Sequence, residues 1–229
     1  MTAAHPSDVP NRMGATPLEL LPPGAQALVD AAKRLLMEGG MDALRIEKIA
    51  AAAGQNRAMI RYYFGNKAAL VGRVVDELMH EQVVDLRAQA ESLPEGEARI
   101  SAHVDTSLEF TVSPDFAAFF HVLPAAMRDD NLRDRIADLY IWYRQQNREC
   151  LDPRPTAGSQ EKVATLATIF LATMDGLLVQ EILAPGLVAH AAVGSMLKAI
   201  ITFVLEYYPD DVQATPEVSQ MAATKTVTR

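Results

Sequence analysis

The feature that most constrains the fold of this chain is a pair of short apolar faces at helical spacing, one on each side of a glycine. The first face consists of Ile46, Ile49, Ala50 and Ala53. These positions stand at i, i+3, i+4 and i+7, the spacing of one buried helical face. Gly54 follows at once, and glycine adopts the left-handed conformation that ends a helix without a Cβ clash. The sequence therefore predicts a short helix that stops abruptly.

A second short helix is expected directly after the glycine. Asn56 can cap it, and Ile60 and Phe64 stand one turn apart, where they can anchor it to a core. Two short helices joined by a tight glycine-containing turn form a helix-turn-helix, whose second helix enters the DNA major groove. A preceding helix at about 26–38, stopped by Gly39 and Gly40, completes a predicted three-helix domain over residues 25–72.

The same stretch resembles a known family. The segment GQNRAMIRYYFGNKAAL is similar to the recognition-helix region of the TetR family of transcriptional regulators, and ALVDAAKRLLMEGGMDAL resembles the family's first helix and glycine turn. Farther along, ATIFLATMDGLLVQEILAP resembles the penultimate helix of that family. The segment FFHVLPAAMRDDNLRDRIADLYIWYR resembles the regulatory domain of its BetI-like branch.

An all-α fold of about nine helices is expected, with a helical effector-binding and dimerisation domain at 73–208 after the DNA-binding domain. Residues 1–24 are expected to form a flexible arm, and 209–229 a loose tail. Prolines, glycines and caps divide the rest of the chain into helices. These helices are expected at about 66–93, 97–112, 115–123, 132–150, 161–183 and 187–207, with a loop at 151–159. Pro124 is expected to break or kink the helix at 115–123, and Asn131 to cap the helix at 132–150.

The charge distribution supports a DNA-binding end. The chain carries a net charge of −8, yet residues 25–75 hold eight basic and four acidic residues, a net +4 that leaves −12 for the rest. We call residues 25–75 the head. A protein with a basic head and an otherwise acidic chain can bind phosphates at the head only.

Composition narrows the remaining classes of protein. Hydrophobic residues at 49% and charged residues at 22% are typical of a soluble protein. No uninterrupted apolar run approaches the roughly 18 residues that span a bilayer, and the first residues lack a signal-peptide pattern. Cys150 is the only cysteine, which excludes an internal disulfide and a thiolate zinc cluster. We therefore expect a cytoplasmic protein without a membrane partner, a metal or a cofactor.

Residues at the start of a recognition helix face base edges. Arg57, Ala58, Met59 and Arg61 are the candidates here. Either arginine could bind guanine O6 and N7 in a bidentate manner, although an arginine on a helix surface can also be a solvated charge.

The family resemblance implies further contacts with DNA. Tyr63 and Lys67 match positions that usually hold phosphates, and Arg45 stands where a small hydroxyl residue often touches one. Asn56 and Tyr62 complete the predicted DNA surface, although Tyr63 could pack in the core and Tyr62 could only cover its neighbours.

Three positions depart from the family pattern, the first of them Arg45, so the operator sequence cannot be read from the chain. An aromatic residue often stands at the position of Arg61, and an arginine often stands at the position of Glu47. A glutamate there could accept a hydrogen bond from cytosine N4 or pair with a neighbouring cation.

The last two long helices are apolar over more than one face, which indicates a homodimer interface. The predicted interface residues are Leu177, Leu178, Ile182, Met196, Leu197, Ile200, Ile201 and Val204. The alternative is that all of this surface serves the core of one chain.

Large apolar side chains in the central helices suggest a pocket for an apolar or aromatic effector. The candidates are Phe110, Phe116, Phe120, His121, Met127, Trp142, Tyr143 and Met174. Ordinary helical cores use the same residue types. His103 and His121 lack a partner at metal-ligand spacing, so a core or surface role is expected for each.

The family resemblance implies a ligand-responsive regulator, by default a repressor, that binds a near-palindromic double-stranded operator as a homodimer and is released by a small molecule. An enzyme is disfavoured because GxSxG, GxxxxGK[ST] and HExxH patterns are absent, so no catalytic residue is predicted. The rival hypothesis is a helical small-molecule-binding protein, or a cryptic enzyme, with a degenerate DNA-reading head.

Overall fold

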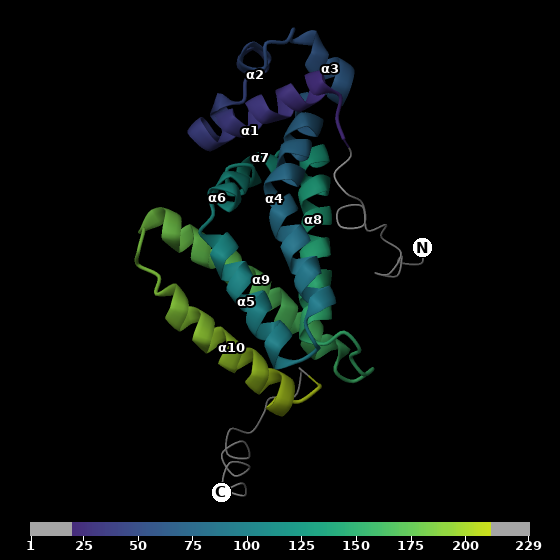
Figure 1. Cartoon of the computed structure of the whole chain (residues 1–229), viewed down its shortest axis with the longest axis vertical. Helices are drawn as coiled ribbons and strands as arrows, with labels where there is room; N and C mark the ends of the chain where they lie inside the picture. Colours follow the sequence, from purple (N-terminus) through teal and green to yellow (C-terminus); the bar gives the residue numbers. More distant parts are fainter. Residues whose placement is uncertain (1–19, 212–229) are drawn as a thin grey trace, which may run out of the picture. The chain divides into compact units, whose positions relative to one another are not determined.

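The computed structural model describes residues 20–211, except for the side chains of residues 81, 87 and 90. Within this range the chain forms ten helices and no strand (Figure 1), which confirms the all-α prediction. The helices are α1 (Pro23–Ala43), α2 (Ile46–Ala52), α3 (Ala58–Phe64), α4 (Lys67–Ser92), α5 (Glu97–Thr111), α6 (Pro114–Phe120), α7 (Leu123–Ala126), α8 (Asp130–Leu151), α9 (Gln160–Leu183) and α10 (His190–Tyr207). Most of the predicted arm and tail lies outside the described residues.

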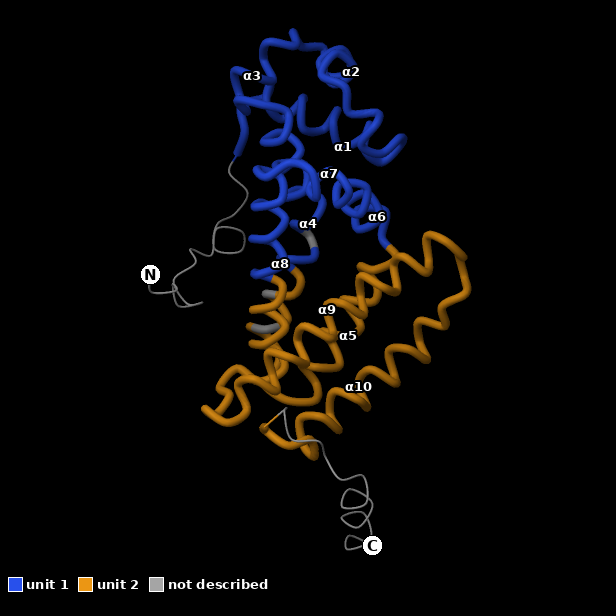
Figure 2. Tube along the Cα trace, turned by 180° about the vertical axis from the view of Figure 1, so that it is seen from behind, with its two compact units in different colours: residues 1–84, 113–142 blue, residues 85–112, 143–229 orange. Residues whose placement is uncertain are grey.

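The chain divides into two compact units, coloured separately in Figure 2. Unit 1 comprises residues 1–84 and 113–142, and unit 2 comprises residues 85–112 and 143–229. The division passes through α4 and α8, so each of these long helices contributes to both cores. Unit 1 therefore contains α6, α7 and the first part of α8 in addition to the predicted DNA-binding helices.

The core of unit 1 follows from the apolar spacing of α1. Leu28, Val29, Ala32 and Leu36 are fully buried, as the i, i+4 and i+8 pattern predicts. The helical backbone angles stop at Gly39 and Gly40, as expected, although hydrogen bonding continues across this kink to Ala43. Gly40 has φ +61° and ψ −160°, a conformation that is essentially restricted to glycine.

Two predicted helix boundaries are wrong. Pro124 was expected to break the helix at 115–123, but α6 already ends at Phe120 and Pro124 lies in the first turn of α7. Proline is tolerated there because first-turn amides lack helical acceptors. Asn131 was expected to cap α8, but the helix starts at Asp130, two residues before the predicted start, and Asp129 Oδ1 accepts the hydrogen bond from Leu132 N at 3.1 Å. The short helix α7 is the reason for ten helices instead of about nine.

The core of unit 2 is built by α5, α8, α9 and α10. Its buried side chains are Ile100, Val104, Leu108, Leu151, Val163, Leu166, Ala167, Phe170, Met174, Leu177 and Ile201. α10 packs along α5 in Figures 1 and 2, and Gly194 makes this approach possible because a Cβ there would lie 2.9 Å from Leu108 Cδ1.

A buried lysine holds the end of α10. The Nζ of Lys162 donates to the carbonyls of Leu205 (3.2 Å) and Tyr208 (3.1 Å) and lies 2.7 Å from Asp210 Oδ1. Since the last carbonyls of a helix have no intrahelical donor, this ammonium both satisfies them and complements the helix dipole.

Among the described residues, one helix, α9, is long and apolar enough to cross a membrane by its length and composition alone. This is weak evidence, because a core helix passes the same test. Phe170 and Met174 of α9 are buried in the core of unit 2.

Candidate nucleic-acid interface and regulatory sites

The turn between α2 and α3 has the expected chemistry. Gly54 has φ +64°, and the amide of Gln55 donates to the carbonyl of Ala50 at 2.8 Å. Asn56 Oδ1 then accepts a hydrogen bond from Ala58 N at 2.9 Å, although the residue directly before α3 is Arg57. Ile60 is only 2% exposed and fixes α3 against the rest of the head. The helix-turn-helix is thus set by local residues.

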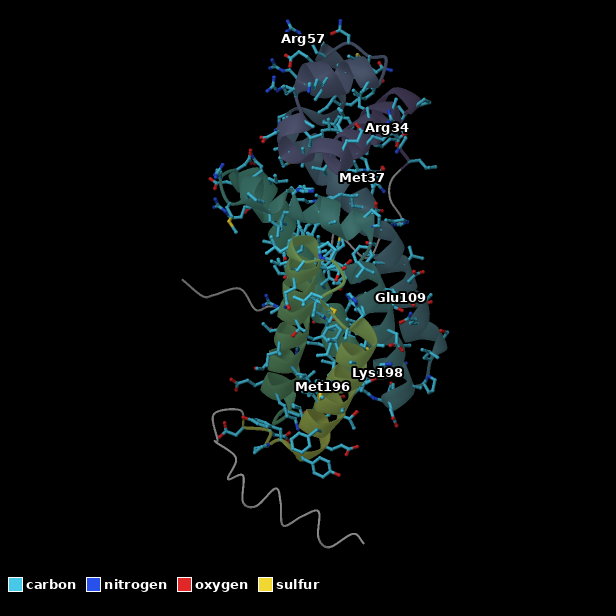
Figure 3. All side chains as sticks on the ribbon, turned by 90° about the vertical axis from the view of Figure 1, so that its left-hand side faces the viewer. Arg34, Met37, Arg57, Glu109, Met196 and Lys198 are labelled. Atoms are coloured by element: carbon cyan, nitrogen blue, oxygen red, sulfur yellow. The ribbon has the colours of Figure 1, made fainter. Side chains whose placement is uncertain are left out.

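The cations around this turn are not paired by the part of the chain that the structure describes. Arg45, Lys48, Arg57 and Arg61 are exposed, and Lys67 is half-buried. None of them makes an ion pair or side-chain hydrogen bond within residues 20–211. Arg57 lies at the outer end of the head (Figure 3). These charges are therefore available to an anionic partner.

Several cations elsewhere in unit 1 are paired. Arg135 of α8 binds Asp76 of α4 through both carboxylate oxygens, and Lys33 of α1 lies 3.0 Å from Asp115 of α6. Burial raises the pKa of the Asp76 carboxyl above its usual value, while Arg135 opposes this shift. These ion pairs join helices of unit 1 to one another, whereas the cations around the turn make no such contact within residues 20–211.

The aromatic residues of α3 have different environments. Tyr62 is 76% exposed and meets Tyr63 edge to face, with ring centroids 5.0 Å apart. Tyr63 is half-buried, and a Cβ at Gly24 would lie 2.9 Å from its hydroxyl. Tyr63 therefore packs against the start of α1, while Tyr62 points to solvent. Of the other predicted contacts, Ala58 is exposed and Met59 is half-buried.

Residues 28–74 match the sequence model of the bacterial regulatory proteins of the tetR family. This matched segment of the chain is similar to the DNA-binding domain of the TetR family. No curated protein matches the chain in sequence. The BetI-like branch of the family is not addressed by these matches and stays a prediction.

Solved structures of other regulators are similar over most of the chain. A transcriptional regulator from Rhodococcus sp. Rha1 has a TM-score of 0.65 at 18% identity, covering 84% of this chain and 99% of that one. The fatty acid degradation regulator FadR from Bacillus halodurans has a TM-score of 0.61 at 19% identity, covering 82% and 98%. A TetR-family member from Streptomyces coelicolor A3 has a TM-score of 0.61 at 20% identity, covering 80% and 98%. At these identities the likeness concerns the fold alone.

The segment that matches the family model contains α2 and α3, the two helices of the helix-turn-helix. Sequence reasoning did not include Lys48, an exposed and unpaired cation of α2, in the DNA surface. It also missed the packing of α1 on α6, where the His121 ring lies 3.5 Å from a Cβ placed on Gly40. The glycine pair was visible in the sequence, but its partner on α6 was not.

The predicted effector residues divide between the two units. In unit 1, Phe116 and Trp142 are buried, Phe120 is half-buried, and His121 and Met127 are exposed. The rings of Phe116 and Phe120 lie edge to face at 5.3 Å, so these two residues are brought together. In unit 2, Tyr143 and Met174 are buried and Phe110 is half-buried. Burial raises the pKa of the Tyr143 hydroxyl, so this group stays neutral.

Unit 2 also contains a buried polar pair that the sequence did not reveal. His103 Nε2 of α5 lies 2.6 Å from Asn147 Oδ1 of α8, and the two residues are 5% and 2% exposed. Burial lowers the pKa of His103 to about 4, so its imidazole is neutral at neutral pH. Beside it lies a cavity of about 10 Å³, bordered also by Gln89, whose buried Oε1 has no hydrogen-bond partner.

The predicted dimer residues separate into inner and outer positions. Leu177, Leu178 and Ile201 are at most 7% exposed, so the structure places them in the interior and not at a surface. Leu197 and Val204 are partly buried against the same core. The exposed members are Ile182 at 48%, Met196 at 63% and Ile200 at 47%.

Other exposed apolar residues extend this surface. They are Ile169, Val179 and Leu183 on α9, and Phe203 and Tyr207 on α10. Met196, Ile200, Phe203 and Tyr207 repeat at intervals of four, three and four residues, a stripe along one side of α10. α10 therefore has an apolar outer side opposite its core side.

Proposed function

We propose that the chain is a ligand-responsive transcriptional repressor of the cytoplasm that binds a near-palindromic operator as a homodimer and is released by a small-molecule effector. Residues 25–72 act as the DNA-binding domain, and residues 73–208 as the effector-binding and dimerisation domain. The observation that carries this proposal is the set of unpaired cations around the helix-turn-helix. No catalytic residue or cofactor is part of the proposal.

Within the DNA surface, the residues of α3 divide into two roles. Arg57 and Arg61 are exposed and stand one turn apart, so both can reach base edges together with Ala58 and Met59. Their freedom from ion pairs supports this role, because a guanidinium held by a carboxylate could not make bidentate contacts with guanine.

Phosphate contacts fall to residues at the edges of the helix-turn-helix. Arg45 precedes α2, and Lys67 opens α4, whose N-terminus itself favours an anion. Tyr63 offers a hydroxyl, while Asn56 and Tyr62 lie on the exposed side of the same motif. These contacts position the head without reading sequence.

The outer apolar surface of α9 and α10 supports a homodimer. Monomeric proteins seldom expose a continuous apolar stripe such as Met196, Ile200 and Phe203. A two-fold dimer presents two recognition helices related by the same axis, which predicts half-sites one helical turn or a multiple apart.

The effector is proposed to be apolar or aromatic and to bind among the predicted aromatic residues. The buried pair of His103 and Asn147 supplies a neutral hydrogen-bonding group. Burial lowers the pKa of His103 and so disfavours its charged form, and the same environment disfavours a charged ligand. The adjacent cavity of about 10 Å³ holds no more than one water, so the effector requires a conformer with more space. Release from DNA then follows because the effector prefers that conformer.

Selection of bound fragments from genomic DNA, followed by two substitutions, tests the DNA-binding assignment. Arg61→Ala is expected to weaken the selected site by about 1–3 kcal/mol and to leave random duplex nearly unaffected. Lys67→Ala is expected to weaken both duplexes equally and to reduce the salt dependence. Arg34→Ala is a matched control, since Arg34 is an exposed cation of α1 outside the helix-turn-helix. Equal losses on both duplexes for Arg61→Ala would contradict the base-reading role.

A further inference from the structure

The connection between α9 and α10 brings together two buried polar atoms that the described part of the chain does not satisfy. They are Oε2 of Glu181, in the last turn of α9, and Nε2 of His190, which opens α10. Neither atom has a hydrogen-bond partner within residues 20–211, and the two lie 4.0 Å apart. Figure 1 shows this connection at the left-hand edge of the picture. Because a buried polar atom without a partner costs free energy, the pair calls for an occupant.

One oxygen of Glu181 holds the connection in place, and the other is left over. Oε1 accepts a hydrogen bond from Gly186 N at 2.9 Å. Gly186 has φ +78°, which glycine adopts without strain, so the chain can turn here toward α10. Oε2 is therefore held opposite the imidazole of His190. Leu187 of the same connection is 70% exposed, so ions from solvent have access to this end of the two helices.

The separation of 4.0 Å distinguishes between the possible occupants. It is too long for a direct hydrogen bond, which reaches about 3.5 Å at most. One bridging water joins atoms about 4.5 Å apart, since each of its two hydrogen bonds is about 2.8 Å long. A metal ion with bonds of about 2.1 Å holds the two atoms about 3.4 Å apart at the tetrahedral angle and up to about 4.2 Å apart on opposite sides. The observed distance lies within the metal range.

The two donor atoms indicate the class of metal. Imidazole nitrogen and carboxylate oxygen together suit Zn²⁺ and related transition metals, whereas Mg²⁺ and Ca²⁺ prefer oxygen ligands alone. No group of three or more His, Cys, Asp or Glu side chains that could hold a metal is present in the described part of the chain. The other coordination positions are therefore left to water, and binding is weaker than at a structural zinc site with four protein ligands.

The end of α9 favours a cation beside Glu181. The last carbonyls of a helix carry partial negative charge, and α9 has no basic residue in its last turn. A carboxylate at this end is destabilised until a cation neutralises it. The start of α10 opposes a cation at His190, so the metal depends on direct bonds to both side chains and not on the field of the helices.

We propose that Glu181 and His190 bind one Zn²⁺ or a similar transition-metal ion, which ties the end of α9 to the start of α10. This site goes beyond the proposed regulatory function, and neither residue belongs to the predicted effector, dimer or DNA sets. The two polar atoms are already covered by their own chain, so a homodimer formed through the outer side of α10 does not remove them. The sequence led us to expect no metal, because the turn at Gly186, and not a sequence spacing, brings the two side chains together.

Isothermal titration of the full-length protein, without a polyhistidine tag, tests the site with Zn²⁺ and Mg²⁺ as probes. Zn²⁺ is expected to bind saturably with one ion per chain, and Mg²⁺ at least about tenfold more weakly. Cys150 does not compete for the ion, because burial raises the pKa of its thiol to about 12 and keeps it protonated. Absence of saturable Zn²⁺ binding, or equal binding of the two ions, would overturn the proposal.

Four glutamine variants assign the ligands. Glu181→Gln keeps an oxygen that can accept from Gly186 N but removes the charge, and it is expected to weaken Zn²⁺ binding about tenfold or more, as is His190→Gln. The matched controls are Glu161→Gln, an exposed carboxylate of the same helix α9, and His80→Gln, a half-buried histidine of α4. Both controls are expected to bind Zn²⁺ like wild type. Equal affinities in the four variants would place the ion elsewhere and overturn the assignment.

Thermal unfolding provides a second readout that does not depend on heats of binding. An ion that binds only the folded chain raises the midpoint of unfolding. Zn²⁺ is therefore expected to raise the midpoint of wild type and of both controls, but not that of Glu181→Gln or His190→Gln. Circular dichroism without metal shows whether each variant keeps its helices. A midpoint raised equally in folded Glu181→Gln and in wild type would contradict the bond between α9 and α10.

Discussion

The neutral imidazole of His103 should make stability depend on pH below neutrality. The ordinary pKa of histidine is 6.5, whereas burial lowers the pKa of His103 to about 4. Below pH 6.5 the imidazole of His103 binds a proton in the unfolded chain but stays neutral in the folded chain. The free energy of unfolding therefore decreases as pH falls from 6.5 toward 4. Between pH 7.5 and 5.0 this single group should cost about 2 kcal/mol, at 1.36 kcal/mol for each unit of pH inside that window.

His103→Gln isolates this contribution, because glutamine can donate to Asn147 Oδ1 but does not titrate. Urea unfolding of both proteins, followed by circular dichroism at one fixed protein concentration, gives the free energy of unfolding at each pH. The difference between wild type and variant should shrink or reverse by about 2 kcal/mol at pH 5.0. Parallel pH profiles of the two proteins would refute the argument that His103 is held neutral.

Three further substitutions test other parts of the structure. Lys162→Met should lower the free energy of unfolding by about 2–3 kcal/mol because three acceptors lose a charged donor. Lys198→Met, which removes an exposed ion pair, should lower it by less than about 1 kcal/mol, and urea unfolding distinguishes the two variants. Gly40→Ala should lower the free energy of unfolding by about 1–3 kcal/mol, because Gly40 has a positive φ that alanine adopts only with strain. Gly176→Ala inside α9 should not lower it, and equal shifts of the thermal unfolding midpoint in the two variants would contradict this reasoning. Ile200→Glu should produce monomers in sedimentation equilibrium with little loss of helicity, and an intact dimer would exclude that surface.

The DNA-reading head could be predicted from sequence because its determinants are local. A glycine after an apolar face and an asparagine two residues later fix the turn: Gly54 has a positive φ, and Asn56 Oδ1 accepts a hydrogen bond from Ala58 N. The same reasoning failed at Pro124, because a proline in sequence is equally compatible with breaking a helix and with opening one.

Burial on an apolar helix could not be assigned to one face from sequence. Leu177, Leu178 and Ile182 lie within six residues of each other, yet the first two are interior and the third is 48% exposed. A helix that is apolar around its circumference gives no period from which to choose the face. The hydrogen bond between His103 and Asn147 could not be predicted either. The two residues are 44 positions apart, and only the packing of α5 on α8 brings them together.

The distribution of ion pairs gives a physical reason why the head can bind DNA at little cost to folding. An exposed ion pair contributes at most about 1 kcal/mol, so leaving Arg45, Arg57 and Arg61 unpaired sacrifices little stability. Each of these cations can instead neutralise a phosphate and release a condensed counterion, a gain that grows as salt is lowered. The half-buried pair of Arg135 and Asp76 differs, because Asp76 without its partner would leave a carboxylate in a site that already raises its pKa. Pairing is therefore present at the half-buried carboxylate of Asp76 and absent, within residues 20–211, at the exposed cations of the helix-turn-helix, where an external anion can replace it.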